Sequence, residues 1–212
     1  MTSAAGNILV AAAGVAFCYV MMVSKPHYAD LVAPIPVRAA ITETAKARTF
    51  DVKVEKVTFA RTLQAERFGA HKLLTTGGVW AIVAVDLSAT QASTTVGEAV
   101  WRGATGLSYR ISERVGFGPG LPPHALEPGL PRRALFVFEL PPSEATGATL
   151  LISGGRFAPL DSQVKIRLGD VPLDEAGEPD DLVGIYDVSE PIGVGDERSG
   201  ARRSGDRTAH SG

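Results

Sequence analysis

The fold of this chain is decided by the stretch Val79-Trp80-Ala81-Ile82-Val83-Ala84-Val85-Asp86-Leu87, which is apolar at every position except Asp86. A dense apolar run of this length predicts a β-strand in the middle of a sheet, covered on at least one face. Trp80 lies inside the run and is the natural aromatic anchor of the predicted core. Trp101 lies on a weaker strand and is expected to matter less.

Shorter strands are predicted on both sides of this run. Phe50, Val52 and Val54 alternate with charged residues, and the alternation slips at Glu55-Lys56, as it does at a β-bulge. Further strands are predicted over residues 97–101, 107–111, 134–140, 149–153 and 163–168. Gly- and Pro-rich turns separate these strands, and no amphipathic stretch long enough for a crossover helix intervenes, which excludes parallel βαβ units.

The strands are compatible with an antiparallel sandwich or a barrel. Most of them have one apolar and one polar face, which favours the sandwich. We therefore predict an all-β fold, an immunoglobulin-like antiparallel β-sandwich of seven to eight strands preceded by one N-terminal apolar helix.

The N-terminal segment carries no charged side chain from Met1 to Ser24, and residues 8–23 are strongly apolar. A bilayer core is spanned by about 20 apolar residues, and Pro26 ends a helix. We expect residues 1–24 to form a transmembrane or signal-anchor helix that contacts the lipid bilayer through residues 8–23. A cleaved signal peptide and a buried core helix are the alternatives, although no good cleavage site follows the apolar run.

The rest of the chain divides by composition. Residues 25–48 contain three prolines and are predicted to be a linker, and residues 49–171 are predicted to form the sandwich. Residues 172–212 are predicted to be an acidic, mostly disordered tail, with a candidate edge strand over residues 182–188.

Three stretches resemble the bacterial DUF4352 family of immunoglobulin-like domains, whose fold is shared with telokin-like secreted mycobacterial antigens. They are residues 78–88, with the pattern G-x-W followed by alternating valines; residues 107–112, around a tyrosine; and residues 126–141, with an L-x-P-G turn before a strand. The resemblance covers residues 49–171. It implies an extracytoplasmic domain on a signal or membrane anchor, and it implies no catalytic residues.

No pattern in the sequence predicts catalysis, a cofactor or a metal site. The four histidines, His27, His71, His124 and His210, lack ligand spacing and are expected in solvated loops. One cysteine excludes an internal disulfide, and a formal net charge of -2 gives no general attraction to nucleic acid. We therefore expect a protein that is not an enzyme and does not bind nucleic acid.

A Gly- and Pro-rich stretch over residues 116–133 is the candidate contact site. Long loops in compact domains are often binding loops. Apolar and basic side chains in this loop are suited to contact a partner, and the candidate contact residues are Phe117, Leu121, Leu126, Arg132 and Arg133.

These observations predict a membrane-anchored, extracytoplasmic module with a binding or structural role in the bacterial cell envelope and an unknown envelope protein as partner. Lys25 and Arg38 follow the apolar segment, and by the positive-inside rule they favour the opposite orientation. The alternatives are therefore the same module facing the cytoplasm, and a small-ligand-binding or hydrolytic envelope protein.

Overall fold

The computed structural model describes residues 2–25, 33–67, 70–116, 118, 120–155 and 161–189. The chain divides into an N-terminal unit, Met1–Ala33, and a larger unit, Pro34–Gly212. The predicted disorder beyond residue 192 lies outside the described residues.

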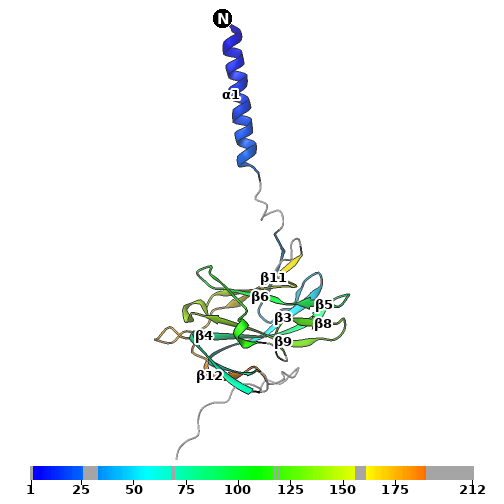
Figure 1. The fold of residues 1–212 in the computed structure, drawn as a ribbon, viewed down its shortest axis with the longest axis vertical. Coiled ribbons are helices and arrows are strands. Elements are labelled where there is room, and N and C mark those ends of the chain that lie inside the picture. Colours follow the sequence, from blue (N-terminus) through cyan, green and yellow to red (C-terminus); the bar gives the residue numbers. More distant parts are fainter. Residues whose placement is uncertain are drawn as a thin grey trace, which may run out of the picture. The chain divides into compact units, whose positions relative to one another are not determined.

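The N-terminal unit contains one helix, α1 (Thr2–Val23), drawn at the N-terminal end of the ribbon in Figure 1. The segment Gly6–Val23 has a mean hydropathy of 2.0, and none of it is buried. By length and composition this helix is able to cross a membrane, as predicted. A signal sequence and a membrane anchor both have these properties.

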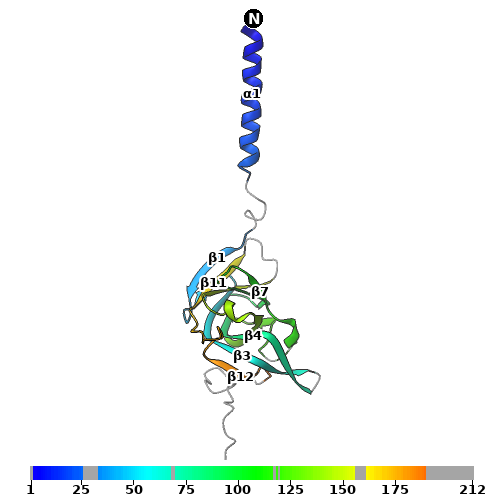
Figure 2. The same ribbon diagram turned by 90° about the vertical axis from the view of Figure 1, so that its left-hand side faces the viewer.

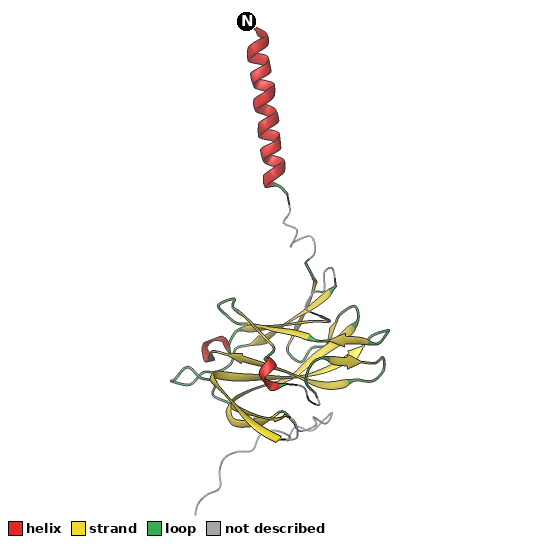
Figure 3. Ribbon diagram, in the orientation of Figure 1, coloured by secondary structure: helices red, strands yellow, loops and turns green. Residues whose placement is uncertain are grey.

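The larger unit is a β-sandwich, as predicted, and Figure 3 shows that its described residues are almost entirely strands and loops. Its strands are β1 (Ile35–Ala40), β2 (Ala45–Lys46), β3 (Phe50–Arg67), β4 (Ala70–Ala89), β5 (Thr94–Val96), β6 (Glu98–Arg102), β7 (Ser108–Arg110), β8 (His124–Leu126), β9 (Arg132–Leu140), β10 (Ala148–Ser153), β11 (Ser162–Gly169) and β12 (Leu182–Asp187). Two single-turn 3-10 helices, η1 (Glu113–Val115) and η2 (Pro142–Glu144), also lie in the described part of this unit.

Two sheets form the layers of the sandwich. One has the strand order β1-β11-β10-β6-β7, and the other has the order β12-β3-β4-β9, with β2 paired to β3. The short strands β5 and β8 pair separately. Neighbouring strands are antiparallel except at two sheet edges, where β1 pairs with β11 and β12 pairs with β3 in parallel.

Strand β4 confirms the central strand predicted from residues 79–87, because it lies between β3 and β9 and is buried on both faces. The predicted slip at Glu55-Lys56 is also confirmed. The pairing register of β3 and β4 shifts between Val54 and Lys56, so Glu55 is the extra residue of a bulge.

The central core fills the space between the two sheets. Val79, Val83 and Val85 enter it from β4, and Ile152 and Ile166 enter it from the facing sheet. Trp101 of β6 is fully buried in this core, and its ring lies edge-on to Phe59 with 6.1 Å between centroids.

The opposite face of β4 carries a second, smaller group of buried apolar side chains, which we call the outer cluster. It contains Ala60, Leu63, Ala65, Leu74, Trp80, Ile82, Val115, Leu121, Leu135, Val137 and Val188. Its far side is formed by the hairpin of β3 and β4, which projects from the sandwich in Figure 2.

The two tryptophans therefore differ from the prediction in one respect. Trp80 is a buried core residue, as predicted, but it belongs to the outer cluster. Trp101 is equally buried and lies in the central core, so the expectation that it matters less is not supported by its position.

The sheets extend beyond the predicted sandwich boundaries of residues 49–171. Strands β1 and β2 lie inside the predicted linker 25–48, and β12 lies inside the predicted tail 172–212. Short edge strands with prolines and charges give weak sequence signals. All eight predicted strands are present, and β1, β2, β5 and β8 are additional to them.

Candidate functional site

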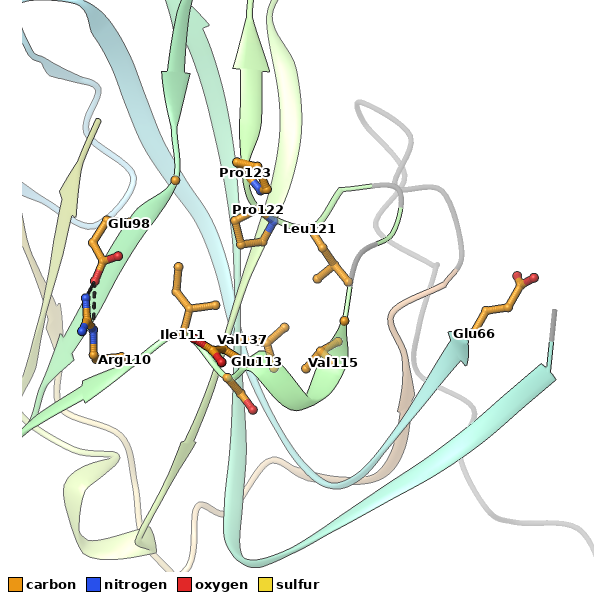
Figure 4. Close-up of a pocket in the computed structure, with 13 residues that line it drawn as sticks. Glu66, Glu98, Arg110, Ile111, Glu113, Val115, Leu121, Pro122, Pro123 and Val137 are labelled. Atoms are coloured by element: carbon orange, nitrogen blue, oxygen red, sulfur yellow. Dashed lines mark hydrogen bonds and ion pairs between the residues drawn. The ribbon is translucent and has the colours of Figure 1, made fainter. Parts of the chain in front are cut away.

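A groove of about 770 Å³ opens beside the outer cluster. It lies between the β6–β7 pair, η1, the start of the predicted contact loop and the end of β3 (Figure 4). The residues that line it are Glu66, Gly97, Glu98, Arg110, Ile111, Ser112, Glu113, Val115, Gly116, Leu121, Pro122, Pro123 and Val137.

The groove exists because two segments cover the free edge of β9. The Ser112 amide donates a hydrogen bond to the Val137 carbonyl over 2.8 Å, and the Leu135 amide donates to the Gly120 carbonyl over 2.6 Å. These bonds hold η1 and the loop against the same strand edge. The side chains of Val115, Leu121 and Val137 give the groove an apolar side that continues into the outer cluster.

Helix η1 is fixed in place by Arg114. Its guanidinium donates to both carboxylate oxygens of Glu139, at 2.9 and 3.0 Å, and to the Thr75 carbonyl at 2.8 Å. The same group lies 5.2 Å from the ring centroid of Trp80, within the range of a cation–π contact. Arg114 therefore joins η1 to β4 and β9 and sets the positions of Glu113 and Val115 in the groove.

The charged residues of the groove are mostly acidic. Glu98 pairs with Arg110, with 2.6 Å between Nη2 and Oε1 (Figure 4). Within the described part of the chain, Glu66 and Glu113 make no ion pair. Among the described lining residues, three carboxylates and one guanidinium therefore leave a net negative charge around an apolar surface.

Comparisons with known proteins give a likeness of fold only. No protein-family model matches the chain, and a search of curated protein sequences found no match. A secreted protein from Mycobacterium tuberculosis superposes with a TM-score of 0.47 and 13% identity, over 63% of this chain and 98% of that one. The yjhA protein from Bacillus subtilis superposes with a TM-score of 0.44 and 16% identity, over 61% of this chain and 98% of that one. An uncharacterized β-sandwich protein from Clostridium difficile 630 superposes with a TM-score of 0.40 and 14% identity, over 63% of this chain and 95% of that one.

The structure separates the candidate contact residues. Leu121 lines the groove but is almost fully buried, and Leu126 is buried in the central core. Arg132 is exposed and donates to the Ala125 carbonyl. Phe117 lies outside the described residues.

Arg133 is already occupied by a partner inside the fold. Its guanidinium donates to the Asp86 carboxylate from Nε at 2.8 Å and from Nη2 at 3.2 Å, across the β4–β9 pair. The hydrogen bond to Asp86 raises the pKa of Arg133 above its usual value, although partial burial opposes the shift. Of the four candidates that the structure describes, only Leu121 lines the groove.

The charged groove residues were missed by sequence reasoning. Glu66, Glu98 and Glu113 lie on three separate segments, and each is an ordinary surface carboxylate in its local sequence. Only the folded sheet edge brings them together. The one signal that pointed to this region was the Gly- and Pro-rich loop that contains Leu121.

The expectation that His124 lies in a solvated loop is wrong. It begins β8, is fully buried, and its ring meets Phe136 edge-on with 5.1 Å between centroids. Neither ring nitrogen has a hydrogen-bond partner among the described residues. Burial lowers the pKa of His124 to about 4, and the positive charge of Arg132 acts in the same direction.

The other histidines and the acidic residues give no metal cluster in the described ranges. His71 is exposed on β4, while His27 and His210 lie outside the described residues. The groove therefore offers apolar contact and negative charge as its two means of recognition.

Proposed function

We propose that this chain is a membrane-anchored, extracytoplasmic β-sandwich module of the bacterial cell envelope that binds a partner and is not an enzyme. The observation that carries the proposal is α1. Every side chain described from Gly6 to Val23 is exposed, and none is charged. Exposed apolar surface is unfavourable in water at roughly 25 cal/mol per Å², so a bilayer is the environment that suits this helix.

The extracytoplasmic side is supported by the resemblance of residues 78–88, 107–112 and 126–141 to DUF4352 domains, and membership of that family is part of the proposal. Lys25 and Arg38 favour the opposite orientation. Two charges are a weak signal, and long domains are translocated largely regardless of their charge.

Binding is favoured over catalysis by the chemistry of the groove. Ser112 supplies the hydroxyl in the described lining, and that oxygen accepts a hydrogen bond from the Arg114 amide at the start of η1. No histidine lines the groove beside it in the described residues. An apolar surface flanked by Glu66 and Glu113 suits an extended, cationic peptide segment with apolar side chains. We propose such a segment of a neighbouring envelope protein as the ligand.

The orientation is tested by protease treatment of intact spheroplasts that carry the full chain. We expect the sandwich to be digested from outside, and the untreated chain to stay with the membrane fraction. Full protection, alongside a digested external control protein, would place the sandwich in the cytoplasm. Recovery of the untreated sandwich in the soluble fraction would show that α1 is a cleaved signal and would contradict the anchor.

Groove binding is tested with a short fluorescent peptide of alternating arginine and leucine, added to the chain ended at Ser189 in nonionic detergent. We expect the Glu66→Gln/Glu113→Gln variant to bind about tenfold more weakly, since two partly exposed charge pairs of up to about 1 kcal/mol each are lost. Fluorescence anisotropy measures the affinity.

The matched control is Glu175→Gln/Asp181→Asn, which removes the same charge from exposed residues that do not line the groove. Its affinity should equal that of the unaltered chain. Equal weakening by both double variants would show that the peptide responds to net charge and not to the groove.

A further inference from the structure

We infer that the groove has an intramolecular occupant, the C-terminal segment of this same chain, residues 190–212. The inference rests on the proposed function, because it assigns a regulator to the same groove. The segment lies outside the described residues. Three observations support the assignment: the place where the described chain ends, the order of residues in the segment, and the charge of the groove.

The described chain ends beside the groove. Strand β12 runs parallel to β3 as far as the pair Asp187 and Gln64, and the Val188 amide donates to the Gln64 carbonyl over 2.9 Å. The last paired residue of β12, Asp187, lies opposite Gln64, two residues before Glu66 on β3, and Ser189 follows Asp187 by the same two residues. Glu66 lines the groove.

The last buried side chain among the described residues also lies in this region. Val188 is 1% exposed and lies in the outer cluster with Val115 and Leu121, both of which line the groove. The C-terminal segment thus begins next to the apolar side of the groove, and its first residues need no long path to reach it.

The segment carries apolar residues first and basic residues after them, and the groove has an apolar side and acidic residues. Its first residues include the apolar Pro191, Ile192 and Val194, and arginines follow at 198, 202, 203 and 207. Over residues 190–212 the four arginines are balanced by Glu190, Asp196, Glu197 and Asp206, so the cationic part of the segment is residues 198–207, where Asp206 is the only acidic residue. An extended chain spans about 3.3–3.6 Å per residue, so these arginines are able to reach Glu66 and Glu113 while the apolar residues lie against Val115 and Leu121.

Because the segment is part of the same chain, weak contacts are sufficient for it to occupy the groove. A segment attached by a short flexible linker has an effective concentration in the millimolar range. An intrinsic affinity of similar size therefore keeps the groove partly occupied without a specialised interface. A cationic partner segment at sufficient concentration displaces the C-terminal segment, so the device sets a threshold for partner binding.

The test uses the full chain in nonionic detergent. Cys18 is replaced by serine, and a nitroxide spin label is attached through Ser204→Cys. We expect the label to broaden the amide signals of Glu113, Val115 and Leu121 at least twofold more than those of Leu107 and Leu130. These controls are exposed and do not line the groove.

Two variants separate the causes. Replacement of the four arginines by glutamine should abolish the differential broadening, and so should Glu66→Gln/Glu113→Gln. Addition of 1 M salt, where the Debye length is about 3 Å, should reduce it. Broadening of the groove amides that only matches the controls, or that survives the arginine replacement, would overturn the inference.

Peptide binding distinguishes this inference from the proposed function. We expect the full chain to bind the arginine–leucine peptide about fivefold more weakly than the chain ended at Ser189. Equal binding by both chains would overturn the intramolecular occupant and leave the groove function standing. Differential broadening without peptide binding by the shortened chain would support the occupant and reject the proposed ligand.

Discussion

Replacement of Trp101 by alanine is expected to destabilise the sandwich by about 3–5 kcal/mol, a large fraction of the roughly 5–15 kcal/mol that holds a domain folded. Trp101 is fully buried between the two sheets and touches the rings of Phe59 and Phe138. Its indole N–H also donates to the Glu144 carbonyl over 2.8 Å. Truncation therefore leaves both a cavity and a buried carbonyl without its donor.

Thermal unfolding followed by circular dichroism measures this effect. A loss of this size corresponds to a melting temperature lower by roughly 6–20 °C. Trp101→Phe keeps most of the ring volume and loses the hydrogen bond, so it should cost about 1–3 kcal/mol. A melting temperature for Trp101→Ala equal to that of the unaltered protein would show that the ring is not part of the central core.

Acidification is expected to weaken the fold through His124. A buried imidazole whose pKa is lowered to about 4 is neutral in the folded state, whereas the unfolded state is protonated below about pH 6.5. Its contribution to stability is therefore complete above pH 6.5 and is lost as the pH falls toward 4. The full loss is about 3 kcal/mol, of which about 2 kcal/mol is lost between pH 7.5 and pH 5.

Urea denaturation at pH 7.5, 6.5, 5.8 and 5 measures this dependence. His124→Phe, which keeps an aromatic ring beside Phe136, should remove most of it, because no proton then binds on unfolding. His71→Gln is the matched control, since His71 is exposed. A slope unchanged by His124→Phe would contradict the assignment of the pH effect to this residue.

The strands could be predicted because their side-chain period was visible. The alternation of Phe50, Val52 and Val54 and its slip at Glu55 appear unchanged in the register of β3 and β4. The assignment of faces could not be predicted in the same way. Residues 79–85 are apolar at odd and even positions alike, so nothing in the stretch indicates that Trp80 turns away from the sandwich interior.

The hairpin over residues 60–78 and the groove were missed for a related reason. Leu63, Ala65 and Leu74 are widely spaced among polar residues, and their burial depends on Val115 and Leu121, which arrive from a distant loop. The loop itself was singled out correctly as unusual. Its apolar residues were expected to contact a partner. Leu126 instead packs in the central core, because it lies on β8, which pairs with β5.

The parallel edge strands constrain how this protein is made. Ile35 pairs with Ser162, and Leu182 pairs with Phe59. The edge strands β1 and β12 therefore each pair with a strand that is distant along the chain. Such non-local contacts form slowly, because loop-closure entropy opposes them until the whole chain is present. During synthesis, which proceeds from the N-terminus, strand β3 lacks its edge partner β12 until more than a hundred further residues have been made. A nascent chain of this topology stays incompletely folded until residues 182–187 have emerged, which is compatible with the transfer across a membrane proposed above.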